Sequence, residues 1–233
     1  MNKEEFIKEL SKLNIILTEK QLSDLEKYYE LLVEENKKYN LTNITKKEDV
    51  YLKHFYDSLT IIKGIELNNQ YICDIGTGAG FPGLVLKIVF PKLKVDLLDA
   101  TLKKCNFLNL VISTLNLKGI NVINVRAEEY SIKTREKYDI VTSRAVAPLK
   151  HLLEYSTPLL KIKGTFIALK SNIDEELLNI DNYYKKLNLV NTKIVEFLLP
   201  KESSKRTLFI IEKSKKTPKM YPRTYNQIKK KEI

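Results

Sequence analysis

Hydrophobic residues recur at helical spacing through the first quarter of the chain, which contains no run typical of a strand. A helix is predicted over residues 18–38, where apolar and aromatic side chains recur every three or four residues, at Leu22, Leu25, Tyr28, Tyr29 and Leu32. Another helix is predicted over 3–12, and after a polar turn at 40–47 a third runs from about 48 to 62. We therefore expect residues 1–62 to form an N-terminal helical segment.

From residue 63 the pattern changes, and short apolar runs alternate with helical stretches. Strands are predicted at 71–75, 95–98, 120–125, 138–142, 164–169, 190–198 and 207–212. Helices are predicted at 82–90, 101–115, 148–160 and 175–187. This alternation predicts an α/β domain over 63–213 with a doubly wound, mostly parallel, seven-stranded sheet that ends in an antiparallel hairpin. A basic C-terminal tail, 214–233, follows it.

The first predicted strand leads into a glycine-rich turn, with Gly76, Gly78 and Gly80 at alternate positions. A strand, a tight glycine turn and a helix N-terminus form a site where backbone meets a nucleotide-like ligand. Asp74, two residues before the first glycine, would repel a pyrophosphate and favour a cationic amino-acid group, such as the methionine moiety of S-adenosylmethionine. Asp99 ends the second strand, where a carboxylate can accept both ribose hydroxyls. The alternative is an ordinary βα turn with Asp99 as a helix cap.

The following strand ends carry further candidates on the same edge of the sheet. The segment 126–129 follows the third strand and could contact an adenine, or it could be a solvated polar loop. Arg144 ends the fourth strand, where a buried guanidinium is costly unless it is paired. Arg144 could hold the base edge or grip the cofactor carboxylate. His54, Asp57 and Ser58 share one helical face, which we expect to pack over the cofactor and line the base pocket.

The formal charge of +11 favours a polyanionic partner, although a lysine-rich composition can also reflect an AT-rich genome. The tail alone carries +6, and arginine is scarce, so an arginine is expected where its planar fork matters. Arg135 is expected to be an ordinary surface residue. Cys73 and Cys105 are expected to be buried thiols of a cytoplasmic protein, because the first residues are charged and no apolar run reaches membrane-spanning length. Two distant histidines make a metal site unexpected.

These motifs together resemble the bacterial 16S rRNA guanine-N7 methyltransferases, a family often called glucose-inhibited division protein B. The resemblance runs from about residue 36 to 223 and rests on an ordered series of short matches: Asn40–Thr42, His54, Asp57–Ser58, Asp74–Gly83, Leu97–Asp99, Arg126, Glu128, Ser143–Ala145, Ala168–Lys170 and Tyr221–Arg223. After Tyr221–Arg223, similar proteins have a glycine followed by prolines, whereas this chain has Asn226, Ile228 and Glu232.

The resemblance implies a Rossmann-like methyltransferase fold, S-adenosylmethionine as cofactor and a guanine in the decoding-region loop of small-subunit rRNA as substrate. Together with the turn chemistry, it places the cofactor at Asp74, Gly76, Gly78, Phe81, Asp99, Ala100, Thr101, Ala127, Glu128 and Arg144. RNA phosphates are expected at Arg126, Lys170, Arg206 and Arg223. The partner would be 16S rRNA or a small-subunit assembly intermediate, with the protein acting as a monomer away from membranes.

The chemistry implied by the resemblance needs no general base, because guanine N7 carries a lone pair and no proton. Positioning of the acceptor is expected from Arg144 and His54, and no loop after a strand offers a cysteine nucleophile. Three alternatives remain open: a methyltransferase for another RNA or a small molecule, a nicotinamide-dependent oxidoreductase, which Asp74 argues against, and a non-catalytic ribosome-assembly factor.

Overall fold

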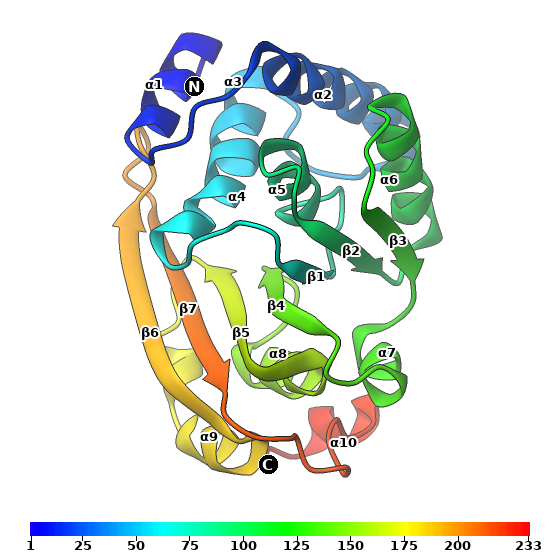
Figure 1. Ribbon diagram of the computed structural model, residues 1–233, viewed down its shortest axis with the longest axis vertical. Helices are drawn as coiled ribbons and strands as arrows, with labels where there is room; N and C mark the ends of the chain where they lie inside the picture. The colour runs from blue at the N-terminus through cyan, green and yellow to red at the C-terminus, as the bar shows by residue number, and fades with distance from the viewer.

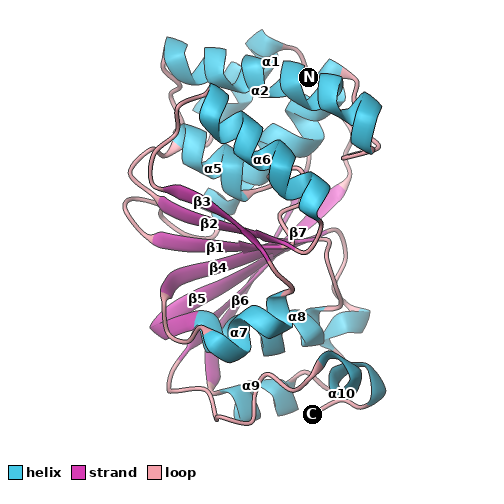
Figure 2. Cartoon of the chain, turned by 90° about the vertical axis from the view of Figure 1, so that its right-hand side faces the viewer, coloured by secondary structure: helices cyan, strands magenta, loops and turns pink.

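The computed structural model describes all residues, 1–233, and its elements form three layers, with a central sheet between two layers of helices (Figure 2). The strands are β1 (Tyr71–Ile75), β2 (Lys94–Asp99), β3 (Ile120–Asn124), β4 (Tyr138–Arg144), β5 (Leu160–Lys170), β6 (Leu189–Leu198) and β7 (Lys205–Lys213). Their order in the sheet is β3-β2-β1-β4-β5-β7-β6. β1 to β5 pair in parallel, and β7 pairs antiparallel with both β5 and β6. The seven predicted strands and the terminal hairpin are confirmed.

One helical layer combines the N-terminal segment with the two helices that follow β1 and β2 (Figures 1 and 2). Its members are α1 (Lys3–Ser11), α2 (Glu19–Tyr39), α3 (Lys47–Asp49), the π-helical turn η1 (Val50–Tyr56), α4 (Asp57–Leu59), the 3₁₀ turn η2 (Thr60–Lys63), α5 (Gly83–Val89) and α6 (Leu102–Thr114). The opposite face carries α7 (Ala127–Lys133), α8 (Leu149–Ser156), η3 (Thr157–Leu159), η4 (Glu175–Leu177), α9 (Asp181–Leu187) and α10 (Tyr225–Lys230).

The helices differ from the prediction in several places. The helix expected over 175–187 is divided into the 3₁₀ turn η4 and the helix α9. The segment expected as one helix over 48–62 changes from α-helical to π-helical and then to 3₁₀ winding. The segment 126–129, for which a polar loop was one reading, begins α7. The tail contains α10, which starts with a capping box in which Thr224 and Gln227 satisfy each other's backbone amides.

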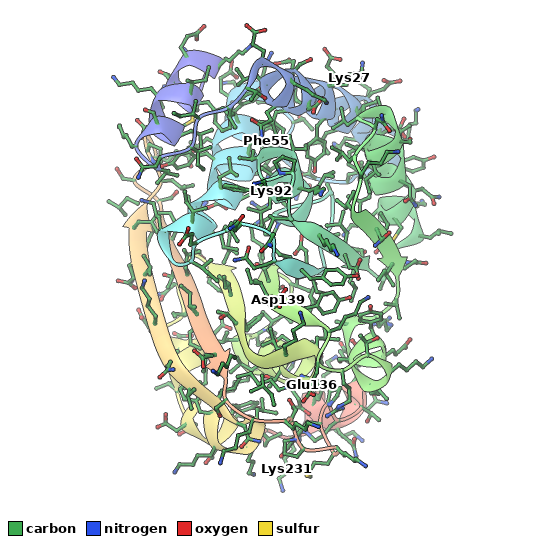
Figure 3. All side chains as sticks on the ribbon, in the orientation of Figure 1. Lys27, Phe55, Lys92, Glu136, Asp139 and Lys231 are labelled. Carbon is green, nitrogen blue, oxygen red and sulfur yellow. The ribbon has the colours of Figure 1, made fainter.

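The N-terminal segment shares one hydrophobic core with α5, α6 and their face of the sheet. This cluster of 37 buried residues runs from Phe6 and Leu25 to Leu84 and Leu108. Figure 3 shows Phe55 in the interior of this layer, and its side chain is fully buried. The predicted boundary at residue 62 is therefore a change of secondary structure within one continuous core.

The C-terminal tail is folded onto the opposite layer. Tyr221 and Ile228 join the second core cluster of 22 buried residues, which also contains Cys73. Arg135 donates hydrogen bonds to the carbonyl oxygens of Thr217, Pro218 and Tyr221. The expectation that Arg135 is an ordinary surface residue is therefore wrong, because its guanidinium holds the tail against the domain. Both cysteines are buried thiols, as expected, and none of the helices has the length and apolarity that crossing a membrane requires.

Candidate cofactor and acceptor site

A cavity of about 990 Å³ lies where the carboxyl ends of the parallel strands meet. Its walls come from the turns after β1, β2, β3 and β4, as expected for a doubly wound sheet. Leu41, Thr42, Asn43 and His54 of the N-terminal segment close one end, and α8 and α10 close the other. This volume is at the upper end of the range typical of small-molecule sites, about 300–1,000 Å³.

The glycine turn lies at the centre of this cavity. Gly76, Gly78 and Gly80 all have positive φ, at 65°, 62° and 104°, a region that residues with a Cβ rarely adopt. A Cβ added at Gly78 would enter open space, where the nearest atom beyond its chain neighbours is Gly76 O at 4.0 Å. A Cβ at Gly80 would instead lie 2.5 Å from the Tyr28 hydroxyl. The missing side chain of Gly78 thus leaves the turn open toward the cavity, and the missing side chain of Gly80 makes room for the Tyr28 hydroxyl.

Asp74 braces the turn from behind and does not line the cavity. Its fully buried Oδ2 accepts hydrogen bonds from Thr77 Oγ1 at 2.6 Å and from the Gly83 amide at 2.8 Å, whereas Oδ1 has no partner. Burial raises the pKa of Asp74 to about 7, against the lowering effect of these hydrogen bonds. The predicted direct contact with a cofactor is corrected here, because the side chain is directed into the sheet–helix junction.

Asp99 does line the cavity, at the end of β2. Its Oδ2 accepts from the Gly78 amide at 3.0 Å, and its Oδ1 accepts from the Thr101 amide at 2.8 Å. The carboxylate is therefore held at the rim of the glycine turn, and its contact with a ribose stays a prediction. Ala100 also lines the cavity, whereas Thr101 contributes only the amide that orients Asp99 and is not part of the wall.

Arg144 lies at the end of β4 with its guanidinium packed against Phe81 of the glycine turn, 5.1 Å from Cζ to the ring centre. Nη1 donates to the Lys53 carbonyl at 3.0 Å and to Asp57 Oδ2 at 3.2 Å. Nη2 lies 3.2 Å from His54 Nδ1. The sequence argument that this arginine must be paired is confirmed by these contacts, and Arg144 and His54 line the cavity side by side.

His54 is held as a neutral imidazole. Its ring stacks on Phe81 with centroids 4.2 Å apart, and Nε2 lies 3.0 Å from Thr42 Oγ1. Nδ1 lies 3.2 Å from both Arg144 Nη2 and the Lys53 carbonyl oxygen. Because a guanidinium can only donate and the Lys53 carbonyl already accepts from Arg144 Nη1, we assign Nδ1 as the acceptor from Arg144 and place the proton on Nε2, facing Thr42. Burial, together with the positive charge of Arg144, lowers the pKa of His54 to about 3.

The wall after β3 combines Val125, Arg126, Ala127 and Glu128. Glu128 is buried, and Arg126 Nη1 lies 3.9 Å from its carboxylate. Beside this wall, α8 and α10 contribute four side chains to the lining: His151, Tyr155, Tyr225 and Lys229. The part of the site predicted to hold the adenine is thus lined by the turn after β3, which was predicted, and by α10, which was not.

Of the four residues predicted to bind RNA phosphates, Arg126 is the most exposed, with 60% of its side chain accessible, and its one ion pair is a long contact of 3.9 Å with Glu128. Lys170 pairs with Glu176 at 2.8 Å and donates to the Ala147 carbonyl, Arg206 pairs with Asp57 at 3.1 Å, and Arg223 pairs with the fully buried Glu154 at 2.8 Å. These three residues are held in intramolecular ion pairs, and their contact with RNA phosphates stays a prediction.

Several cavity residues were not predicted as site residues. Tyr225 and Lys229 lie in the tail, which its charge marked only as a path for RNA. The T-x-x-Q spacing of Thr224 and Gln227 was the available signal for a folded helix there. Thr42 belongs to a stretch that carried the family resemblance, yet nothing in the sequence around it predicted its hydrogen bond with His54.

The cavity fits S-adenosylmethionine. The open position above Gly78 leaves room for close approach of a ligand, and Asp99 presents a carboxylate beside it. The paired Arg144 offers a guanidinium that can bind a carboxylate. The residues expected to hold such a cofactor are Gly76, Gly78, Phe81, Asp99, Ala100, Ala127, Glu128 and Arg144.

The three-layer architecture, the strand order of the sheet, and the glycine turn with Asp99 at the carboxyl edge of the strands define the chain as a Rossmann-like, S-adenosylmethionine-dependent methyltransferase. A family model described as "rRNA small subunit methyltransferase G" (GidB) matches residues 21–208. The chain belongs to this family.

Curated relatives agree along nearly the whole chain. It is 47% identical to ribosomal RNA small subunit methyltransferase G of Staphylococcus carnosus, covering 96% of this chain and 95% of that protein. It is 48% identical to the protein of the same name from Mesoplasma florum, covering 94% of this chain and 92% of that protein.

Solved structures support the fold. The chain is similar to a SAM-dependent methyltransferase from Aquifex aeolicus, with TM-score 0.54 and 17% identity over 72% of this chain and 96% of that one. It is also similar to M. jannaschii TYW2 in complex with AdoMet, with TM-score 0.56 and 12% identity over 73% of this chain and 79% of that one.

Proposed function

We propose that this protein transfers a methyl group from S-adenosylmethionine to N7 of a guanine in the decoding-region loop of 16S rRNA. The observation that carries the proposal is the single cavity that joins the glycine turn and Asp99 to the paired Arg144 and His54. Membership of the rRNA small subunit methyltransferase G family supplies the substrate class. The protein would act in the cytoplasm as a monomer.

The chemistry asks for alignment rather than proton transfer. When bound, the cofactor supplies an electrophilic methyl group next to a sulfonium, and guanine N7 supplies a lone pair. A group that positions both reactants converts a bimolecular step into a nearly unimolecular one, an effect worth up to about 7–11 kcal/mol. Thr42, His54 and Arg144 close the end of the cavity nearest the glycine turn and are suited to this positioning.

The neutral state of His54 suits this reaction. Methyl transfer to N7 places a positive charge on the purine, so an imidazolium beside it would oppose the reaction. With its pKa lowered to about 3, His54 stays uncharged at neutral pH. Asp57 partly compensates the remaining positive charge of Arg144. We assign Arg144 to the carboxylate of the cofactor, because a guanidinium on the N7 edge would compete for the lone pair.

RNA would approach the mouth of the cavity, where Arg126 is exposed and Lys229 lines the wall. Contacts of this kind position the backbone without reading sequence, and they make affinity depend on salt.

Two measurements test the proposal. Titration with S-adenosylmethionine and, separately, NAD should give saturable binding of the first alone. Transfer of labelled methyl groups to naked 16S rRNA, to small subunits and to bulk tRNA should label rRNA-containing substrates and not tRNA. Labelling of tRNA, or of no RNA at all, would favour the alternatives of another substrate or a non-catalytic assembly factor.

A further inference from the structure

Asp57 is shared by two arginines that come from different strands. Oδ2 accepts from Arg144 Nη1 at 3.2 Å, and Oδ1 accepts from Arg206 Nε at 3.1 Å. The carboxylate is 7% exposed, so water contributes little to its solvation. Each oxygen of one buried carboxylate thus binds one guanidinium, an arrangement in which the position of each arginine depends on Asp57.

The two arginines differ in what else they contact. Arg144 lines the cavity and packs on Phe81, whereas Arg206 is outside the cavity wall. Arg206 Nη1 donates instead to the Lys205 carbonyl at 3.0 Å, within the start of β7. Arg206 is therefore anchored to the sheet beside the cavity, and its only charged partner is Asp57.

The geometry of Arg144 depends on three acceptors. Asp57 and the Lys53 carbonyl hold Nη1, while His54 Nδ1 accepts from Nη2. All three lie within one turn of the segment 53–57, so the guanidinium plane is fixed by the way this segment winds. Without the Asp57 charge, two partly buried guanidinium groups, 15% and 21% exposed, would lie close together with no compensating anion.

We propose that Asp57 and Arg206 are positioning residues for the cofactor site: Arg206 holds Asp57, and Asp57 orients Arg144 toward the bound cofactor. This inference rests on the proposed function for the role of Arg144. It gives Arg206 an indirect role in cofactor binding, through Asp57, instead of a direct contact with an RNA phosphate. Neither Asp57 nor Arg206 touches the reacting groups.

The test uses the full-length variants Asp57→Asn, Arg206→Gln, Arg206→Lys and the double variant Asp57→Asn/Arg206→Gln. S-adenosylmethionine affinity is measured by calorimetry without RNA, and KM and kcat are measured with 16S rRNA. Loss of the shared charge is expected to weaken cofactor binding about tenfold in Asp57→Asn and less in Arg206→Gln. Arg206→Lys keeps the charge and should restore most of the affinity.

Because Asp57 and Arg206 touch none of the reacting groups and Arg144 is assigned to the cofactor carboxylate, KM for the cofactor should rise while kcat and KM for RNA stay within about twofold. The double variant should bind the cofactor no more weakly than Asp57→Asn, since Arg206 acts only through Asp57. Asp96→Asn is the matched control. Asp96 is also a buried carboxylate with a cationic partner, Lys137 at 2.8 Å, but neither residue lines the cavity.

The outcomes separate the possibilities. Unchanged cofactor affinity in folded Asp57→Asn, or additive losses in the double variant, would overturn the inference. A rise in KM for RNA alone in Arg206→Gln would also overturn it and return Arg206 to a phosphate contact. An equal loss of cofactor affinity in Asp96→Asn would show a merely structural effect. Failure of the wild-type protein to bind the cofactor would instead contradict the proposed function.

Discussion

The Tyr28 hydroxyl on α2 donates a hydrogen bond to the Ala79 carbonyl inside the glycine turn, 51 residues further along the chain. The Tyr28 ring stacks on Phe81 with centroids 5.6 Å apart, and Gly80 makes room for its hydroxyl. Both groups are buried. The N-terminal segment therefore supports the turn on which the cofactor site is built.

Removing this hydroxyl should weaken both the fold and the site. Tyr28→Phe leaves the Ala79 carbonyl buried without its donor, which is expected to cost about 1–3 kcal/mol of unfolding free energy. Cofactor affinity should fall as well, because the turn loses its support. Denaturant unfolding and calorimetry measure the two effects. Tyr39→Phe, at a tyrosine with 42% exposure, serves as the control and should change neither. Full cofactor affinity in Tyr28→Phe would contradict a supporting role.

A methyl group at Gly78 should block the cofactor without further disturbing the protein. Gly78→Ala places a Cβ in the open space of the cavity at φ 62°, and Gly119→Ala places one at φ 71° away from the cavity. Both substitutions carry a similar backbone strain, about 1–2 kcal/mol. A Cβ at Gly119 also lies 3.3 Å from Lys87 Nζ, so thermal unfolding should shift at least as far in Gly119→Ala as in Gly78→Ala, whereas cofactor affinity should fall at least tenfold only in Gly78→Ala. Equal cofactor affinities in the two variants would show that the cofactor does not bind against Gly78.

His54 should stay neutral through the mildly acidic range. The chain has only two histidines, so NMR can follow both imidazoles directly. Because burial and Arg144 lower the pKa of His54 to about 3, its ring signals should not titrate above pH 5. Burial also lowers the pKa of His151, which should titrate before His54 as the pH falls. A His54 midpoint at pH 6 or above would contradict the buried pair with Arg144.

The same shift in pKa predicts how stability depends on pH. Below about pH 6.5 a histidine in the unfolded chain binds a proton, whereas the folded His54 does not until the pH approaches 3. The stability that neutral His54 contributes to the folded protein is therefore complete above pH 6.5 and is lost as the pH falls toward 3. Relative to wild type, His54→Gln should therefore lose this dependence, a difference of about 2 kcal/mol between pH 6.5 and 5. Asp74, whose pKa is raised to about 7, acts in the opposite direction but cancels in the comparison. Parallel stability curves for the two proteins would contradict the assignment.

The tail should depend on one buried ion pair. Glu154 is fully buried and accepts from the backbone amide, Nε and Nη2 of Arg223. Arg223→Ala leaves this buried carboxylate with the backbone amide but without its cationic partner, which is expected to cost about 3–5 kcal/mol. Amide hydrogen exchange in α10 should also be faster in Arg223→Ala than in the wild-type protein. The exposed pair of Lys20 and Asp24 provides the control, since Lys20→Ala should cost less than about 1 kcal/mol. A small effect of Arg223→Ala would show that the tail is held by its apolar contacts.

The sequence predicted the sheet and the glycine turn because both are local patterns: alternating apolar runs, and glycines where φ must be positive. It could not place Arg206 beside Asp57, since 149 residues separate them and the ion pair depends on β7 pairing with β5. It also misjudged Asp74, because a strand buried on both faces gives no signal for the side on which a carboxylate lies. The net charge of the tail hid α10, in which capping and the buried Ile228 outweigh charge.

The central claim is tested most directly by mapping the methyl group. The protein is incubated with labelled S-adenosylmethionine and unmodified small subunits or their naked 16S rRNA, and the RNA is then reduced and cleaved at N7-methylated guanines. Label is expected on the RNA, with strand scission at one guanine in the decoding-region loop. RNA that carries no label, or label on a different base atom, would contradict the account.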